Sequence, residues 1–586
     1  MGTLGISHTS RATKLCLLAI LAAFLALNGL WLWRFRHGQP VDIDEAGYLS
    51  FSLNIFYGGL RNLAATIKSG AYNAPFMPAL AALLYNVTGP YEIAGFAVPV
   101  MLGAGVIAAT YFLGVAVGSP AVGLMSAALV ASCPLILSYV RTFQFSIAAT
   151  LMLSLALVAL LRSDRCRHFG WAIVFGVCMG LVPLSRAMTI AFVPGLIAAA
   201  LVYTLAEPAD RRRRARVLAW SLLAAAAVAA LWFVPNGRYI FSYLFSFGYG
   251  SHAVAYGPAY TRFGLEEWLF MARKLAYEVR LPHFLFILAG AVGMLLMTAS
   301  AFVCDGIWPT VRRIALSPVL PVVAVVLEVV LALMSSQNKG NGFIVPIVPA
   351  ALTLAVWALV HFGRWQWYRR CVAALVVGLT VFAAAPFIDE RLPISRPWQV
   401  QVPILGDAYM SDGRGVVVFL SASAAGLPYN LAKAPMDRET GAAWVDLNTT
   451  MAAKVLNDSR MAAFGFRHAL FNVNAVDLQA LLIFHRDAPV IGQIDPVATN
   501  NTIEGNIVWL TKGDGAGVCI LFTSDDEPGQ FPPAINTRNM EAAAAQTGFQ
   551  EMSRTTMPNG HYVATWDRMA AQCGHEAAGS SSTGPS

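Results

Sequence analysis

The strongest constraint on the fold of this chain is a series of long apolar runs separated by short, arginine-rich connections. A helix needs about 20 apolar residues to cross a bilayer. Of the 586 residues, 57% are hydrophobic, and the mean hydropathy is +0.59. The composition predicts a polytopic α-helical membrane protein and excludes a soluble globular chain. The runs lie at about 16–33, 93–117, 119–139, 145–161, 170–184, 188–205, 217–234, 284–304, 317–335, 343–362 and 371–387.

The basic connections predict how these runs are oriented, because Lys and Arg favour the cytoplasmic side of a membrane. Arg11 and Lys14 indicate a cytoplasmic N-terminus. Simple alternation puts every basic connection on the cytoplasmic side only if the short run Phe76–Thr88 does not cross. We therefore expect about 11 transmembrane helices. The same alternation places residues 141–146, 185–188, 235–283 and 335–342 on the extracytoplasmic side.

The composition changes after residue 390. Short apolar runs alternate there with polar and helix-like stretches, which predicts an extracytoplasmic soluble α/β domain over residues 391–573. The Ser- and Gly-rich tail, 574–586, is expected to be disordered. Cys519 and Cys573 lie in this exported part, and whether they pair is open. The apolar runs of this domain are 415–420, 467–473, 506–510, 517–522 and 561–566.

Three carboxylates open the first extracytoplasmic loop, residues 34–75. Asp42, Asp44 and Glu45 lie within four positions of a chain that is only 12% charged. Acids next to the apolar layer are costly unless they are solvated or paired, so a solvated loop start and a functional cluster both remain open. The stretches that follow, 46–57 and 60–68, are amphipathic. They predict two short helices on the membrane surface, separated at Gly58-Gly59.

The residues around this cluster resemble the GT-C superfamily of membrane glycosyltransferases. The segments DEAGYLSFSLNIFYGGL, from Asp44, and YNAPFMPALAALLYNVTGP, from Tyr72, are similar to the family's first loop. They look most like the branch with protein O-mannosyltransferases and the lipid A aminoarabinose transferase, glycosyltransferase family 39. QNKGNGFIVPIVPAALTLAVWAL, from Gln337, is similar to a second family motif. The resemblance implies a GT-C fold for the membrane region, 1–390.

The resemblance also implies roles for individual residues. Asp44 would act at the glycosyl-transfer centre, as base or as orienter of the acceptor, with Glu45 beside it. Phosphate of the donor would bind to Lys339, Arg186 and Arg141. Gln144 stands near the place where the family often carries a second Asp, so a divalent metal ion remains an open question. The positions expected to line the substrate are Tyr48, Tyr72, Asn73 and Gln144.

The reaction implied is inverting transfer of a sugar from a polyprenyl-phosphate donor to an envelope lipid, polysaccharide or protein. It would take place on the outer side of a bacterial inner membrane. Two readings from other classes compete with it: a lipid flippase or transporter, and a non-catalytic membrane scaffold with an exported binding domain. A transporter predicts broken or charged helices near the midplane and internal repeats, whereas the acids here gather at one interface. The net charge of +8 lies in loops and does not indicate nucleic acid.

Overall fold

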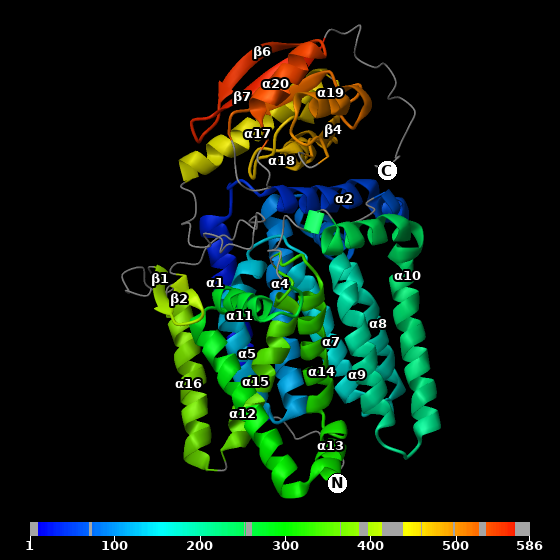
Figure 1. The fold of residues 1–586 in the computed structure, drawn as a ribbon, viewed down its shortest axis with the longest axis vertical. Helices are drawn as coiled ribbons and strands as arrows, with labels where there is room; N and C mark the ends of the chain where they lie inside the picture. Colours follow the sequence, from blue (N-terminus) through cyan, green and yellow to red (C-terminus); the bar gives the residue numbers. More distant parts are fainter. Residues whose placement is uncertain are drawn as a thin grey trace.

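The computed structural model of the chain is a bundle of apolar helices with an α/β domain stacked on one end (Figure 1). The residues it describes are 10–69, 73–250, 252–253, 261–340, 342–363, 365–385, 397–412, 438–458, 460–495, 498–526 and 535–568.

Seven helical segments of the bundle are long and apolar enough to cross a membrane, and two bent pairs raise that number to nine. Two further helices of the same bundle, α7 (Ser146–Arg162) and α8 (Phe169–Ser185), have 17 residues each, near the lower limit for a span. The sequence predicts 11 spans, and only if α7 and α8 both cross does the number reach that value. The seven are α1 (Arg11–Phe35), α4 (Glu92–Val117), η1 with α9 (Ala187–Phe192, Val193–Leu205), α10 (Arg211–Tyr249), α12 (Leu281–Asp305), η3 with α15 (Val345–Ile347, Val348–Phe362) and α16 (Gln366–Ala384).

The two bent pairs break where proline interrupts the helical hydrogen bonds. The helices α5 (Pro120–Ser132) and α6 (Pro134–Val140) meet at 62°, with Pro134 at the start of the second. The helices α13 (Ile307–Ala315) and α14 (Val319–Ser335) meet at 87°, with Pro318 before the second.

The predicted surface helices form one broken element, α2 (Ile43–Ser69), which lies across the end of the bundle beneath the α/β domain (Figure 1). It breaks at Gly59, whose φ of 67° and ψ of 172° suit glycine almost alone. The break falls where the Gly58-Gly59 pair predicted it. The next helix, α3 (Phe76–Thr88), has 13 residues, or about 20 Å at 1.5 Å per residue. That is too short to cross a bilayer, as the basic connections required.

The expected outer loop 235–283 is largely helical in the described residues. The helix α10 continues through Pro235 to Tyr249, and α11 (Leu265–Val279) follows as an amphipathic helix. The helix α11 and the last turns of α10 lie toward the same end of the bundle as α2 (Figure 1).

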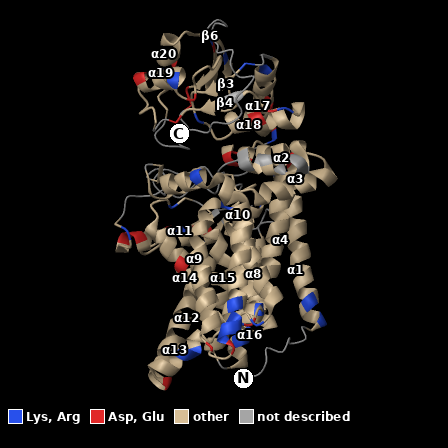
Figure 2. Cartoon of the chain, turned by 90° about the vertical axis from the view of Figure 1, so that its right-hand side faces the viewer, with Lys and Arg blue, Asp and Glu red and all other residues tan. Residues whose placement is uncertain are grey.

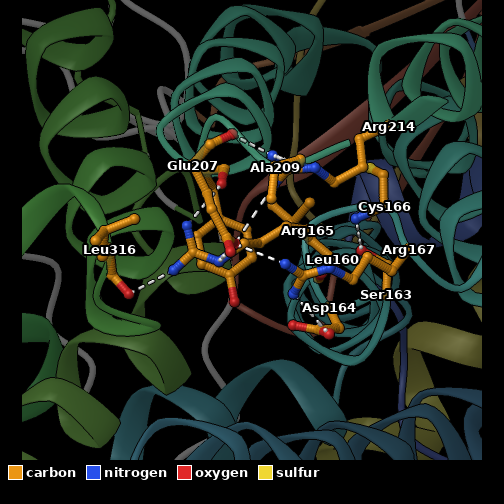
Figure 3. Close-up of polar contacts among 11 residues, drawn as sticks. Leu160, Ser163, Asp164, Arg165, Cys166, Arg167, Glu207, Ala209, Arg214 and Leu316 are labelled. Carbon is orange, nitrogen blue, oxygen red and sulfur yellow. Dashed lines mark hydrogen bonds and ion pairs between the residues drawn. The ribbon is translucent and has the colours of Figure 1, made fainter. Parts of the chain in front are cut away.

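Basic side chains gather at the end of the bundle opposite the α/β domain (Figure 2). A cluster there ties separate connections together (Figure 3). The Glu207 carboxylate lies 2.8 Å from Arg167, 3.6 Å from Arg165 and 3.7 Å from Arg214. Arg165 also donates to the carbonyl of Leu316 at 2.6 Å. The connections after α7, α9 and α13 are thus joined at this end.

The α/β domain has a five-stranded mixed sheet in the order β4-β3-β5-β7-β6. The strand β3 pairs in parallel with β4 and β5, and β7 pairs antiparallel with β5 and β6. Buried aromatic rings such as Phe464, Phe471 and Phe522 form its own core. Its elements are α17 (Arg438–Asp458), β3 (Ala462–Phe464), α18 (Val473–Gln479), η7 (Ala480–Phe484), β4 (Val490–Gln493), α19 (Ile503–Lys512), β5 (Ile520–Ser524), α20 (Thr537–Gln546), β6 (Phe549–Thr556) and β7 (Tyr562–Arg568).

Two of the apolar runs in this domain are strands and two are not. Runs 517–522 and 561–566 overlap β5 and β7. Run 506–510 lies in the helix α19 instead, because Thr502 caps the start of that helix by accepting from the Gly505 N–H. Run 467–473 is an irregular connection into α18. Run 415–420, Cys573 and the tail 574–586 lie outside the described residues.

A two-stranded hairpin precedes this domain, formed by β1 (Pro397–Val402) and β2 (Gly406–Asp412). It packs on α11 and α12, and Ala408 is part of the core of the helical bundle. Among the described residues, the separate α/β core begins at α17, some way beyond the change of composition at residue 391.

Candidate active site

The acidic cluster forms the first turn of α2. The Asp42 carboxylate accepts from the Glu45 N–H at 2.9 Å, and the Glu45 carboxylate approaches the Asp42 N–H at 3.4 Å. This reciprocal pair is a capping box, which satisfies the free N–H groups at the start of a helix. Asp42 is 1% exposed, so a solvated loop start, one of the two interpretations that the sequence left open, is wrong for this residue. Burial, and then the charges of Glu45 and Asp44, raise the pKa of Asp42 well above its ordinary value.

Glu45 joins three segments of the chain. Its carboxylate forms a buried ion pair with Arg36, just after α1, and both side chains are 1% exposed. Its other oxygen accepts from the backbone N–H of Phe143 at 2.8 Å, in the turn between α6 and α7. The Arg36 guanidinium also lies over the ring of Phe96, 4.5 Å from the centroid. Glu45 therefore fixes the first turn of α2 to the bundle.

Asp44 differs from both neighbours because its side chain is exposed. Dense protein nevertheless surrounds the carboxylate, and the desolvation raises the pKa of Asp44 to about 6. Glu45 raises it further, while the positive charge of Arg186 opposes both effects. Asp44 is therefore the acid of this turn that water reaches, although nearby protein desolvates it. A pKa near 6 suits a group that takes up a proton near neutral pH.

Arg186 lies at the end of α8, close enough to Asp44 for its charge to act on that carboxylate, and it contacts two distant segments. Its guanidinium donates to the Ser146 hydroxyl at the start of α7. Its Cζ also lies 4.1 Å from the centroid of the Phe343 ring, before η3. Gly342, at φ of +82°, packs so closely that a Cβ would lie 2.7 Å from the Arg186 Nη1 and 2.5 Å from the Ser146 Oγ. Three of the regions expected on the outer side therefore meet beside Asp44.

Lys339 is buried and paired within the fold. It forms an ion pair with Glu267 of α11 at 2.6 Å, and its ammonium also donates to the carbonyls of Leu333 and Ser336. The side chain is 2% exposed, and burial lowers the pKa of Lys339. An ammonium has three N–H donors, and all three have acceptors here. Its predicted phosphate-binding role gains no support from this arrangement, which fastens α11 to the end of α14.

Arg141 is also engaged within the bundle. Its Nε donates to the Asn28 amide oxygen at 2.9 Å, and its guanidinium lies 4.6 Å from the Trp31 centroid. The side chain is 2% exposed. Both contacts belong to α1, so Arg141 packs the turn after α6 onto that helix. Its predicted phosphate-binding role likewise gains no support.

The expected substrate-lining residues are placed differently from one another. The Tyr48 ring stacks on Phe145 at 3.8 Å between centroids, and burial followed by the Asp44 charge raises the pKa of Tyr48. Gln144 is 9% exposed, and its amide nitrogen has no hydrogen-bond partner among the described residues. Asn73 is half-buried just before α3. Tyr72 lies outside the described residues.

Sequence reasoning did not single out Ser146, Arg36 or Tyr243 as parts of this site. Ser146 holds Arg186, and Arg36 neutralises Glu45. Tyr243, on α10, contributes to the raised pKa of Tyr48. A signal existed only for Arg36, a cation between an apolar run and an acidic cluster. The other two depend on helices that meet only in the fold.

The acids of this turn do not make a metal-binding set. Asp42 and Glu45 are committed to the capping box and to Arg36, which leaves Asp44 as the carboxylate of this turn that faces solvent. Across the described ranges, no three His, Cys, Asp or Glu side chains converge as metal ligands would. A divalent ion typically takes several carboxylate, imidazole or thiolate ligands.

Comparisons with known proteins agree with this architecture. The family model described as dolichyl-phosphate-mannose-protein mannosyltransferase matches residues 72–239. The structure is similar to that of ArnT from Cupriavidus metallidurans in the apo state, with a TM-score of 0.55 at 14% identity, covering 97% of this chain and 100% of that one. No curated protein matches the sequence.

Two lipid-bound structures are also similar. ArnT from Cupriavidus metallidurans bound to undecaprenyl phosphate has a TM-score of 0.52 at 15% identity, with 95% of this chain and 99% of that chain covered. The archaeal oligosaccharyltransferase AglB from Archaeoglobus fulgidus, in complex with an inhibitory peptide and a dolichol-phosphate, has a TM-score of 0.52 at 13% identity. The coverage is 97% of this chain and 76% of that one.

These findings confirm the predicted class: the protein is a polytopic membrane protein with the GT-C fold and a C-terminal α/β domain. The similarity in fold to ArnT extends over 97% of this chain.

Proposed function

We propose that the protein is a glycosyltransferase that moves a sugar from a polyprenyl-phosphate donor to a hydroxyl of an envelope lipid, polysaccharide or protein. The observation that carries the proposal is the pair of Asp44 and Arg186. A solvent-reaching carboxylate with a pKa near 6 lies within the electrostatic influence of a guanidinium, at the end of an apolar bundle. The Asp44 carboxylate can accept a proton from the acceptor hydroxyl, and the Arg186 guanidinium can bind the phosphate of the donor.

In the proposed reaction, the acceptor oxygen attacks the anomeric carbon of the sugar from the side opposite the phosphate. Asp44 takes the proton from the acceptor hydroxyl as the new C–O bond forms. The bond between the anomeric carbon and the phosphate oxygen breaks, and the phosphate keeps the electron pair. Arg186 stabilises the charge that develops on it. A single displacement of this kind inverts the anomeric centre.

The support for a phosphate at Arg186 is chemical. A guanidinium offers a planar fork of donors that matches phosphate oxygens. Here the Phe343 ring and the Ser146 hydroxyl hold it in place. The similar structures of ArnT and AglB contain undecaprenyl phosphate and a dolichol-phosphate, which supports a lipid phosphate as the donor class for this chain. Glu45, by contrast, is proposed to hold the turn that carries Asp44.

The proposed location follows from the basic residues. They gather at the end of the bundle away from the acidic turn (Figure 2), which favours that end as cytoplasmic. We infer a bacterial inner-membrane protein with a cytoplasmic N-terminus and an extracytoplasmic site and α/β domain. The donor lipid would lie among the helices with its phosphate at the outer interface.

The test is a transfer assay with membranes that contain the full-length protein and a panel of labelled polyprenyl-phosphate sugars. The matched variants are Asp44→Asn and Asp42→Asn. Asparagine is as good a helix cap as aspartate, so Asp42→Asn should keep most of the transfer. Asp44→Asn should lose it. Transfer by Asp44→Asn at the wild-type rate would rule out the proposed base, and no transfer by the wild type with any donor would rule out the proposed function.

A further inference from the structure

The α/β domain contacts the bundle through the element that carries the acidic turn. Its helix α18 and the adjoining η7 pack on α2 (Figure 1). Ala475, Leu478 and Leu481 belong to the apolar core of the bundle, whereas most of the domain has a separate core. The helix α2 therefore lies between two independently packed bodies.

One polar contact in this interface lies next to Asp44. The Asn474 side-chain N–H, on α18, donates to the carbonyl of Ile43 at 2.8 Å. Ile43 is the residue immediately before Asp44 in the first turn of α2. The contact joins residues 431 positions apart in the sequence, so no local structure of the loop would create it.

Gly47 leaves the room that this contact needs. A Cβ at Gly47 would lie 2.9 Å from the Asn474 Nδ2 and 3.3 Å from its Cγ, closer than ordinary packing allows. Gly47 lies one turn after Ile43 on the same helix face. Glycine costs a helix interior about 1 kcal/mol relative to alanine, and here it permits the approach of the Asn474 amide.

A second polar contact lies at the other end of the same helical segment. The Tyr57 hydroxyl donates to the Leu481 carbonyl at 3.2 Å and lies 2.6 Å from the His485 Nδ1. Tyr57 immediately precedes Gly58 and the break at Gly59. The segment from Ile43 to Tyr57 is thus held by the α/β domain at both ends, but only the contact with Asn474 adjoins the acidic turn.

We propose that Asn474 is a positioning residue for Asp44, so that the α/β domain contributes directly to the active site. The proposal rests on the proposed function. Glu45 and Arg36 fix the first turn of α2 from the side of the bundle, and Asn474 fixes it from the side of the domain. The direction of the Asp44 carboxylate follows from the orientation of this turn. Proton transfer requires groups held within about 0.5 Å, and an error of about 1 Å costs on the order of 100-fold in rate.

The test compares purified full-length variants in the transfer assay. Asn474→Ala removes the donor, Asn474→Asp keeps the size without the N–H, and Gly47→Ala blocks the approach. All three should lower kcat by about 10- to 100-fold and leave the KM for the donor within about twofold. For Asn474→Ala and Gly47→Ala, the acid limb of the pH profile should move toward the ordinary aspartate value, because a loosened turn admits water around Asp44, which is flanked by Glu45, Tyr48 and Arg186.

The matched control is Tyr57→Phe, which removes a contact of the same interface far from Asp44. It should leave kcat and the acid limb unchanged. The inference is wrong if Asn474→Ala behaves as the wild type. It is also wrong if Tyr57→Phe lowers kcat equally, because docking of the domain rather than positioning would then explain the effect. Full transfer by Asp44→Asn would instead defeat the proposed function, whatever the Asn474 variants do.

Discussion

Asp42, Asp44 and Glu45 are close in sequence but occupy three different environments. Asp42 caps α2, Glu45 is paired with Arg36, and Asp44 faces solvent. Three carboxylates in one turn repel one another, and the fold relieves that repulsion by giving Glu45 a buried cation. Desolvation, and then the negative charge of Glu45, raise the pKa of Asp44. A group at the start of a surface helix thereby becomes suited to proton transfer.

The first prediction concerns pH. A base must be deprotonated, so transfer should fall as pH drops through the Asp44 pKa of about 6. With an ordinary aspartate, kcat/KM would fall only at about pH 4. The measurement is kcat/KM against pH for the wild type at constant ionic strength. A rate that stays flat down to about pH 4.5 would contradict the assignment of Asp44 as the base.

The second prediction concerns Arg186. Hydrogen bonds to charged groups contribute about 1.5–3 kcal/mol, so Arg186→Ala should weaken binding of a polyprenyl phosphate by about 10- to 150-fold. The affinity of Arg186→Lys should lie between those of the wild type and Arg186→Ala, because lysine keeps the charge and loses the planar fork of donors. Binding is measured on the purified protein by native mass spectrometry. The control is Arg216→Ala, an exposed arginine in the basic segment that begins α10; an Arg186→Ala variant that binds as tightly as this control would contradict the assignment.

At the scale of elements, α2 organises the site because its start is fixed to the bundle and its middle is broken. Its start is capped and paired, and its middle breaks at Gly59. The break allows the helix to follow the end of the bundle, where a straight 27-residue helix would extend for about 40 Å.

The third prediction compares two adjacent glycines. Gly59 has a backbone conformation that alanine strains to reach, at a cost of about 1–3 kcal/mol. Gly59→Ala should therefore lower the thermal midpoint in detergent, whereas Gly58→Ala should leave it unchanged or higher. Nothing lies within 4 Å of a Cβ at Gly59, so a clash would not explain the loss. Equal midpoints for the two variants would show that the break is not required.

The sequence predicted the elements whose signals are local. Apolar runs located the spanning helices, and the glycine pair located the break in α2. The basic connections predicted that residues 76–88 do not cross the membrane, and α3 has 13 residues, too few to cross. Short apolar runs in the α/β domain were less informative. Residues 506–510 are helical because Thr502 caps them, and a run of five apolar residues fits either a strand or a helix.

The site was predictable only in part, because local sequence signals do not show which remote helices pack against one another. Asp44 and Arg186 were predicted through the resemblance to the GT-C family, and the charge of Arg186 acts on the Asp44 carboxylate. The contacts of Lys339 with Glu267 and of Arg141 with Asn28 depend on how remote helices pack. An isolated interfacial cation in a sequence does not reveal which carboxylate or carbonyl it will meet.

At the scale of the molecule, the chain has two cores with α2 between them. The basic end lies opposite the α/β domain, and its connections are fastened by Glu207 (Figures 2 and 3). This polarity matches a protein whose site faces away from the cytoplasm.

The fourth prediction tests that orientation with cysteine labelling in intact cells, in a variant otherwise lacking cysteine. A cysteine replacing Lys512, exposed at the end of α19, should react with a membrane-impermeant maleimide added from outside. A cysteine replacing Arg313, 64% exposed at the basic end, should react only after the cells are opened. The reverse pattern would place the site in the cytoplasm.

The most direct test of the central claim measures donor binding and transfer in the same purified Asp44→Asn protein. Because the Asp44 pKa is raised, ionising this group works against folding as pH rises, so the variant should be no less stable than the wild type. The account predicts wild-type binding of the polyprenyl-phosphate sugar, an unchanged thermal midpoint and transfer reduced by about 100-fold or more. Transfer at the rate of the Asp42→Asn control would contradict it.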